Sequence, residues 1–248
     1  MKKISLIVII LLALPVLTFA ADVVTPSINI TLPATDNPKT IAESIKILIL
    51  LTVLALAPSI IVMMTSFTRI IVVLAILRQA LGTQQMPPNQ VLIGIALFLT
   101  FFIMTPQIKS IYYDAYLPLE KNEITLEDAY YKATKPLKEF MLKQTRQKDL
   151  ALFLRIGHIP NPKNPQELSM GVVIPAFIIS ELKTAFEIGF MIYIPFLIID
   201  MIVSSVLMSM GMMMLPPIMI SLPFKLLIFV LADGWNLVVT SLFKSFVR

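Results

Sequence analysis

Five methionines fall within ten residues of a very apolar region, in the segment MSMGMMMLPP at 208–217. Thioethers are soft ligands that can bind copper(I). They are also flexible, polarizable side chains that repack around irregular shapes. The chain has no cysteine, and its single histidine, His158, is distant in sequence. Three readings therefore stand: a methionine-rich core helix, a copper site, or a deformable apolar seal. The residues concerned are Met208, Met210, Met212, Met213 and Met214, with Gly211 and the following prolines favouring a loop.

Ionisable side chains interrupt the same apolar region. Over residues 172–192 the large apolar side chains contribute roughly −5 kcal/mol towards membrane insertion, whereas three central charges cost about +8 to +10 kcal/mol. An isolated helix of this sequence is therefore disfavoured in lipid. Its charges must pair, face water, or lie outside the bilayer. Lys183 and Glu187 can pair along one helix turn, whereas three others need partners elsewhere: Glu181, Asp200 and Lys225. Structural ion pairs and a proton relay are the two alternatives for these three residues.

The sequence contains no motif that indicates catalysis or cofactor binding. The chain shows no glycine-rich phosphate loop, no nucleophile motif and no pair of carboxylates beside a recognisable cleft, and His158 lies in a loop rich in proline and asparagine. We therefore expect neither an enzyme nor a bound metal or cofactor. The formal net charge of +5 is small and dispersed, which gives no indication of nucleic-acid binding.

Composition indicates a membrane protein made of helices. Of the 248 residues, 57% are hydrophobic and 14% are charged, whereas a soluble domain carries about 25% charged residues. Residues 1–20 have the order of a secretory signal: Lys2 and Lys3, an apolar core, then small residues that place cleavage between Ala20 and Ala21. Residues 21–40 form a proline-containing linker. The sequence thus predicts an all-α chain with its mature N-terminus outside the cytoplasm.

The rest of the chain divides into three regions. Residues 41–108 are predicted as a first helical hairpin, with apolar stretches at 41–77 and 90–105 joined by a cytoplasmic loop that follows Arg69 and Arg78. Residues 109–170 are balanced in charge and predict a small external, periplasmic helical subdomain, with Thr125 as an N-cap and Pro136 in the first turn of a second helix. Residues 171–248 are predicted as a C-terminal helical hairpin that carries the methionine-rich loop.

Prolines are frequent within the apolar segments. We expect them to break helices, and broken backbone at membrane depth is tolerated where it is buried in protein or lines a cavity. Four crossings would also leave the basic residues Lys244 and Arg248 outside, against the positive-inside rule. The prolines favour a tightly packed multi-subunit assembly over a lone four-helix bundle. The charge conflict indicates that the last two segments are not ordinary crossings. The prolines concerned are Pro58, Pro106, Pro175, Pro195, Pro216, Pro217 and Pro223.

Three long blocks of this sequence resemble the FliP family of type III secretion systems, whose injectisome equivalent is called SctR. The blocks are TSFTRIIVVLAILRQALGTQQMPPNQVLIGIALFLTFFIMTP, PAFIISELKTAFEIGF and PFLIIDMIVSSVLMSMGMMMLPPIMISLPFKLLIFVLADGW. They are ungapped, and the resemblance covers residues 41–248. The signal and the sizeable external segment fit the flagellar branch better than the injectisome branch.

The resemblance implies a core subunit of the flagellar export gate, in the basal body at the bacterial inner membrane. Such subunits form a homo-oligomer, a pentamer in the family's usual assembly, with FliQ and FliR. FlhB contacts the gate, FliO assists assembly, and unfolded flagellar proteins pass through. The resemblance also implies that residues 208–214 act as a gasket and that Glu181, Asp200 and Lys225 pair between subunits. The alternative, from the residues alone, is an ion- or proton-coupled transporter.

Overall fold

The computed structural model describes residues 38–83, 85–160, 162, 164–212 and 215–246, and every regular element within them is helical. This confirms the all-α prediction. Residues 1–37 lie outside the described residues, so signal cleavage between Ala20 and Ala21 stays a prediction. The helices are α2 (Pro38–Met63), α3 (Phe67–Ala80), α4 (Asn89–Ser110), η2 (Ile111–Tyr116), α5 (Leu117–Glu120), α6 (Leu126–Gln144), α7 (Gln147–Ile156), η3 (Pro165–Glu167), α8 (Met170–Ser209), α9 (Pro217–Leu231) and α10 (Gly234–Phe246).

The chain forms two compact units, Met1–Val53 and Leu54–Arg248. In the first unit, the described residues belong to α2, whose apolar side chains, such as Leu48 and Leu50, are exposed. The sequence predicts one apolar stretch from 41 to 77. The structure instead ends α2 at Met63 and begins α3 at Phe67.

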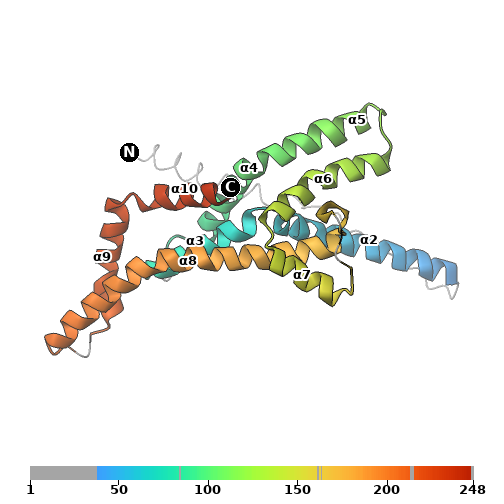
Figure 1. Ribbon diagram of the computed structural model, residues 1–248. Helices are drawn as coiled ribbons and strands as arrows, with labels where there is room; N and C mark the ends of the chain where they lie inside the picture. Colours follow the sequence, from blue (N-terminus) through green and yellow to red (C-terminus); the bar gives the residue numbers. More distant parts are fainter. Residues whose placement is uncertain (1–37, 84, 161, 163, 213–214, 247–248) are drawn as a thin grey trace, which may run out of the picture. The chain divides into compact units, whose positions relative to one another are not determined.

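The second unit is organised around the 40-residue helix α8, against which α3 packs (Figure 1). Ile70, Val73, Leu74 and Leu77 recur on one face of α3 and are fully buried, as the helical repeat requires. On α8, Val173 and Phe177 are buried in the same core cluster. This α3–α8 contact is the centre of the core.

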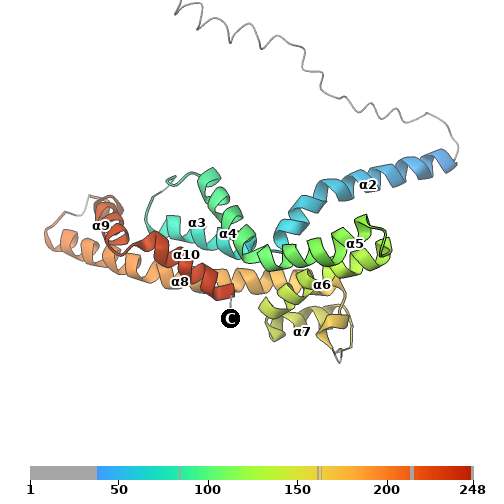
Figure 2. The same ribbon diagram turned by 90° about the horizontal axis from the view of Figure 1, so that it is seen from above.

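Helices α4, η2 and α5 run on from one another as far as Glu120, and α6 then returns alongside η2 (Figure 2). The helix that contains 90–105 therefore continues past residue 108. Thr125 caps α6 as expected, because its hydroxyl accepts the Asp128 backbone N–H at 3.2 Å. The prediction for Pro136 is wrong: it lies inside α6 and starts no helix. A proline removes a single amide donor, and the flanking turns of α6 continue on either side.

The expectation that the prolines break helices is wrong for most of them. Pro216 and Pro217 do mark a helix boundary, since α9 begins at Pro217. Five others lie within helices that continue through them: Pro58, Pro106, Pro175, Pro195 and Pro223. Neighbouring helices and local adjustments can satisfy the freed backbone groups.

Three of the described helical stretches are long and apolar enough to cross a membrane, within α2, in Asn89–Glu120 and in α8. A fourth is reached if α9 and α10, which meet at 65°, together count as one span. Length and composition thus support a multi-pass membrane protein among the described residues.

Candidate functional site

The methionine-rich segment forms the turn between α8 and α9. Helix α8 ends at Ser209, Met210 is its C-cap, and Gly211 follows with φ +74°, a conformation that favours glycine. The Met212 N–H donates to the Leu207 carbonyl at 3.0 Å, and the Gly211 N–H donates to the Met208 carbonyl at 3.0 Å. These two bonds form a Schellman motif, which satisfies carbonyls that the helix end leaves free. Gly211 therefore sets the bend that the sequence predicted.

The methionine side chains of this turn face solvent in the isolated chain. Met208, Met210 and Met212 are 62%, 67% and 40% exposed. Met213 and Met214 lie outside the described residues. The turn lies at the end of the α8–α9 pair farthest from α6 and α7 (Figure 1). The exposed methionines argue against a core helix, and they form an apolar tip of the kind that marks a contact site.

The base of this hairpin is held by an ion pair. Lys225 of α9 contacts the Asp200 carboxylate of α8, with Nζ and Oδ2 2.6 Å apart. The Ser221 hydroxyl donates to the other Asp200 oxygen at 2.5 Å. Lys225 also donates to the Ala80 carbonyl at 3.2 Å, at the C-terminal end of α3, where a cation is favoured. One lysine thus connects α3, α8 and α9.

A second, deeper ion pair joins α3 to α8. Arg69 and Glu181 are 2% and 0% exposed, and they form a bidentate pair whose Nε–Oε2 distance is 2.9 Å. Arg69 also donates to the backbone carbonyl and the hydroxyl of Ser245 at 3.1 and 3.0 Å, and to Gln144 at 3.1 Å. Its guanidinium lies 3.8 Å from the ring centroid of Phe246. The buried arginine therefore has partners on α6, α8 and α10.

These partners revise the basis of the hypothesis of inter-subunit pairing. Asp200 and Lys225 pair with each other, and Glu181 pairs with Arg69, all within one chain. Their burial therefore no longer requires a partner from a neighbouring subunit, and an inter-subunit role for them stays a prediction. Local sequence places Arg69 before the predicted cytoplasmic loop and indicates no partner for it. Its position among buried residues of α3 at helical spacing was the available signal.

Glu187 also finds a partner that the sequence did not indicate. Arg146, just before α7, contacts its carboxylate with Nη2 and Oε2 2.5 Å apart, and also contacts Thr184 at 3.2 Å. The nearby Ser180 hydroxyl donates to Asp149 at 2.6 Å and accepts the Arg146 backbone N–H. These bonds fix the start of α7 against α8. An i to i+4 pair between Lys183 and Glu187 is not among the ion pairs of the described residues.

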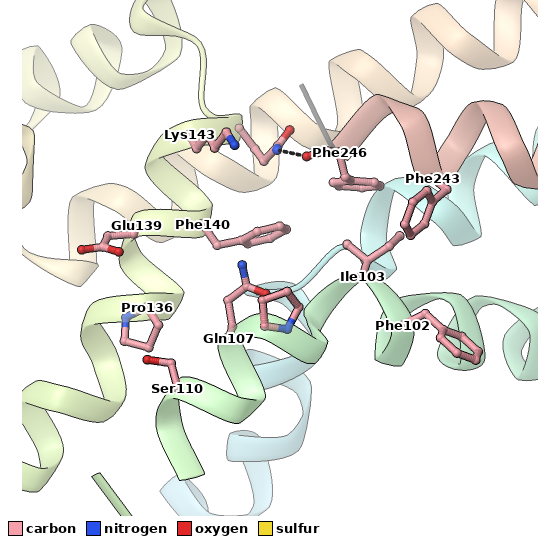
Figure 3. A pocket seen from close by; sticks show the side chains of 12 residues that line it. Phe102, Ile103, Gln107, Ser110, Pro136, Glu139, Phe140, Lys143, Phe243 and Phe246 are labelled. Carbon is pink, nitrogen blue, oxygen red and sulfur yellow. Dashed lines mark hydrogen bonds between the residues drawn. The ribbon is translucent and has the colours of Figure 1, made fainter. Parts of the chain in front are cut away.

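A pocket of about 490 Å³ opens next to the buried arginine, between α4, α6 and α10 (Figure 3). Phenylalanines from all three helices line it: Phe102, Phe140, Phe243 and Phe246. The side-chain oxygen of Gln107 is buried there without a hydrogen-bond partner among the described residues. No group of three His, Asp or Glu side chains in the described part of the chain is arranged to hold a metal ion.

These features define an all-helical membrane protein whose buried charges are compensated between its own helices and whose apolar tip is exposed. The chain matches the FliP family model over residues 50–242. It is 59% identical over 213 residues to the flagellar biosynthetic protein FliP of Bacillus subtilis, which covers 86% of this chain and 96% of that protein. The chain belongs to the FliP family.

Two further relatives also indicate the FliP family. The flagellar biosynthetic protein FliP of Pectobacterium carotovorum is 54% identical over 88% of this chain and 84% of its own length. That of Aquifex aeolicus is 55% identical over 83% of this chain and 87% of its own length. Family membership makes the chain a membrane-associated component of flagellar biosynthesis.

Proposed function

We propose that several copies of this chain form the pore of the flagellar export gate in the bacterial inner membrane, and that the methionine-rich turn closes that pore. The observation that carries the proposal is the exposed tip of the α8–α9 hairpin, where Met208, Met210 and Met212 face outwards from a glycine-directed turn. Repeated around a ring, such tips would meet at the centre.

The chemistry of methionine suits a seal that opens for a passing chain. A pore wide enough for an unfolded protein would collapse ion gradients if it stayed open. The seal must therefore be apolar, deformable and remade after each passage. Unbranched thioether side chains repack around changing shapes, whereas β-branched side chains are stiff at χ1. The chain then acts as a structural subunit rather than as an enzyme.

In this proposal the partners are other copies of the chain in a pentamer, together with FliQ, FliR and FlhB, and FliO during assembly. Support comes from membership of the FliP family and from the extent of exposed apolar surface on α4, α8 and α9. Large exposed apolar surfaces mark contacts with protein or lipid.

The competing hypothesis is an ion- or proton-coupled transporter. Of its candidate carriers, Glu181 is bound at both oxygens by Arg69, and Asp200 is bound by Lys225 and by the Ser221 hydroxyl. Both oxygens of each carboxylate are thus already engaged by groups of the same chain, which suits a structural contact better than repeated proton exchange. This geometry favours the pore proposal.

The proposal is tested by membrane leakage in cells. We expect removal of three methionines from 208–214 to leave assembly intact and to admit small ions, measured as conductance or solute entry. Leucine at these positions should seal nearly as well, because volume and apolarity are kept. Serine at 208, 210 and 212 should cause leakage, whereas serine at Met86, an exposed methionine outside the turn, should not. A shortened turn that assembles and stays tight, or stoichiometric copper in the pure protein, would refute the gasket.

A further inference from the structure

A long groove of about 790 Å³ lies between α8, α9 and α10. Phe196, Phe229 and Val238 are the buried apolar residues of its lining. The volume falls within the roughly 300–1,000 Å³ typical of small-ligand sites, which are mostly apolar with a few placed polar groups. The groove therefore has the size and character of a ligand site.

Polar and apolar groups are separated along this groove. On α8 its polar residues are Thr184 and Glu187, and on α10 they are Ser241, Lys244 and Ser245. These two sets lie at the same end, because Arg69 bonds to both Glu181 and Ser245 and so fixes that part of α8 next to the end of α10. The remaining lining, from 188–199 and 228–238, is apolar. An occupant must therefore have a polar group at one end, next to these residues, and an apolar remainder along the rest of the groove.

The polar end has unused hydrogen-bond donors and a surplus of positive charge. Glu187 is already paired with Arg146. The side chains of Ser241 and Lys244 make no hydrogen bond or ion pair in the described part of the chain. They are three residues apart on α10, so they project from the same face. A free ammonium beside a free hydroxyl suits an anionic oxygen group such as a phosphate.

We propose that this groove binds an anionic phospholipid, with its acyl chains along the apolar part and its phosphate at Lys244 and Ser241. Basic pockets between membrane helices are known to hold such headgroups. The charge argues against an apolar partner helix. An apolar helix in this groove would leave the ammonium of Lys244 without a counter-charge, whereas a lipid phosphate supplies one.

The test uses native mass spectrometry on the full-length chain, purified in detergent and stripped of lipid. Dioleoyl phosphatidylglycerol, dioleoyl phosphatidylcholine and inorganic phosphate are added separately. We expect one phosphatidylglycerol per chain, with much weaker binding of phosphatidylcholine and of phosphate alone. Loss of a charge-assisted hydrogen bond in Lys244→Gln should weaken phosphatidylglycerol about tenfold.

Two further variants separate the groove from general lipid adhesion. Ala232→Phe places a ring in the apolar part and should displace the lipid while helix content, checked by circular dichroism, is kept. Lys132→Gln removes an exposed lysine from α6, none of whose residues lines the groove, and should change nothing. Equal binding of both lipids, unchanged binding in Lys244→Gln, tight binding of phosphate alone, or a chain dimer that excludes the lipid would each overturn the proposal.

Discussion

At the scale of single residues, the buried pair of Arg69 and Glu181 is a contact on which the packing of several helices depends. Both side chains are removed from solvent, and desolvation of two charges is offset only when geometry is good and the remaining donors are satisfied. Here Ser245 and Gln144 accept the remaining guanidinium N–H groups. The pair therefore connects four helices without leaving a charge unpaired.

Loss of one partner should be far more damaging than loss of both. Glu181→Gln leaves Arg69 buried without a counter-charge, and we expect a loss of about 3–5 kcal/mol in stability, measured by thermal unfolding in detergent. The double variant Arg69→Leu with Glu181→Leu should recover part of this loss. Glu187→Gln, in an exposed pair, is the control and should change the unfolding temperature little. Equal shifts for Glu181→Gln and Glu187→Gln would show that burial does not govern this contact.

At the scale of elements, the close packing of α3 on α8 rests on a glycine. A Cβ atom added at Gly189 would lie 2.4 Å from Ile76 Cδ1 and 3.1 Å from Ile76 Cβ. Ile76 is β-branched and stiff at χ1, so it cannot turn away freely. The absence of a side chain at Gly189 therefore allows these two helices to approach.

Gly189→Val should force the helices apart and destabilise the chain by about 1–3 kcal/mol, as overpacking generally does. Shortening the neighbour as well, in Gly189→Ala with Ile76→Ala, should restore part of the loss. Gly94→Ala in α4 is the matched control, because an added Cβ there meets nothing within 4 Å. It should stabilise by about 1 kcal/mol through helix propensity. Thermal unfolding measures all three variants, and a destabilised Gly94→Ala alongside an unaffected Gly189→Val would contradict this account.

At the scale of the whole molecule, Lys225 connects the methionine hairpin to α3. It contacts Asp200 and the Ala80 carbonyl, so it positions the turn on which the proposed seal depends. A hairpin released from α3 would place its tip less accurately in a ring of subunits. In the proposed gate, this residue would therefore link the fold of one chain to the assembly of several.

We expect Lys225→Ala and Asp200→Ala each to reduce assembly of the oligomer, measured by size-exclusion chromatography with light scattering. The exchange Lys225→Asp with Asp200→Lys in every chain should restore assembly wherever the pair acts, because opposite charges still meet. A mixture of the two single charge reversals in separate chains should restore it only if the pair acts between subunits. Normal assembly by both alanine variants would remove these residues from any role in holding the gate together.

The sequence by itself determined the helical class, the membrane character and the loop at the methionine run. Apolar length, the scarcity of charge, and the Gly211 and Pro216-Pro217 boundaries are local properties, and local properties can be read directly. The Thr125 cap was predicted correctly for the same reason, since its bond reaches only to Asp128.

The tertiary structure alone decided the charge partners. Arg69 and Glu181 are 112 residues apart, and Asp200 and Lys225 are 25 apart, so no local pattern indicates that they meet. Each buried charge needs a partner, because an unpaired charge is costly to bury. The packing of α3, α8, α9 and α10 determined which residue became that partner. Likewise Pro136 has the local features of a helix start, yet α6 continues through it, because neighbouring turns and tertiary contacts outweigh one missing hydrogen bond.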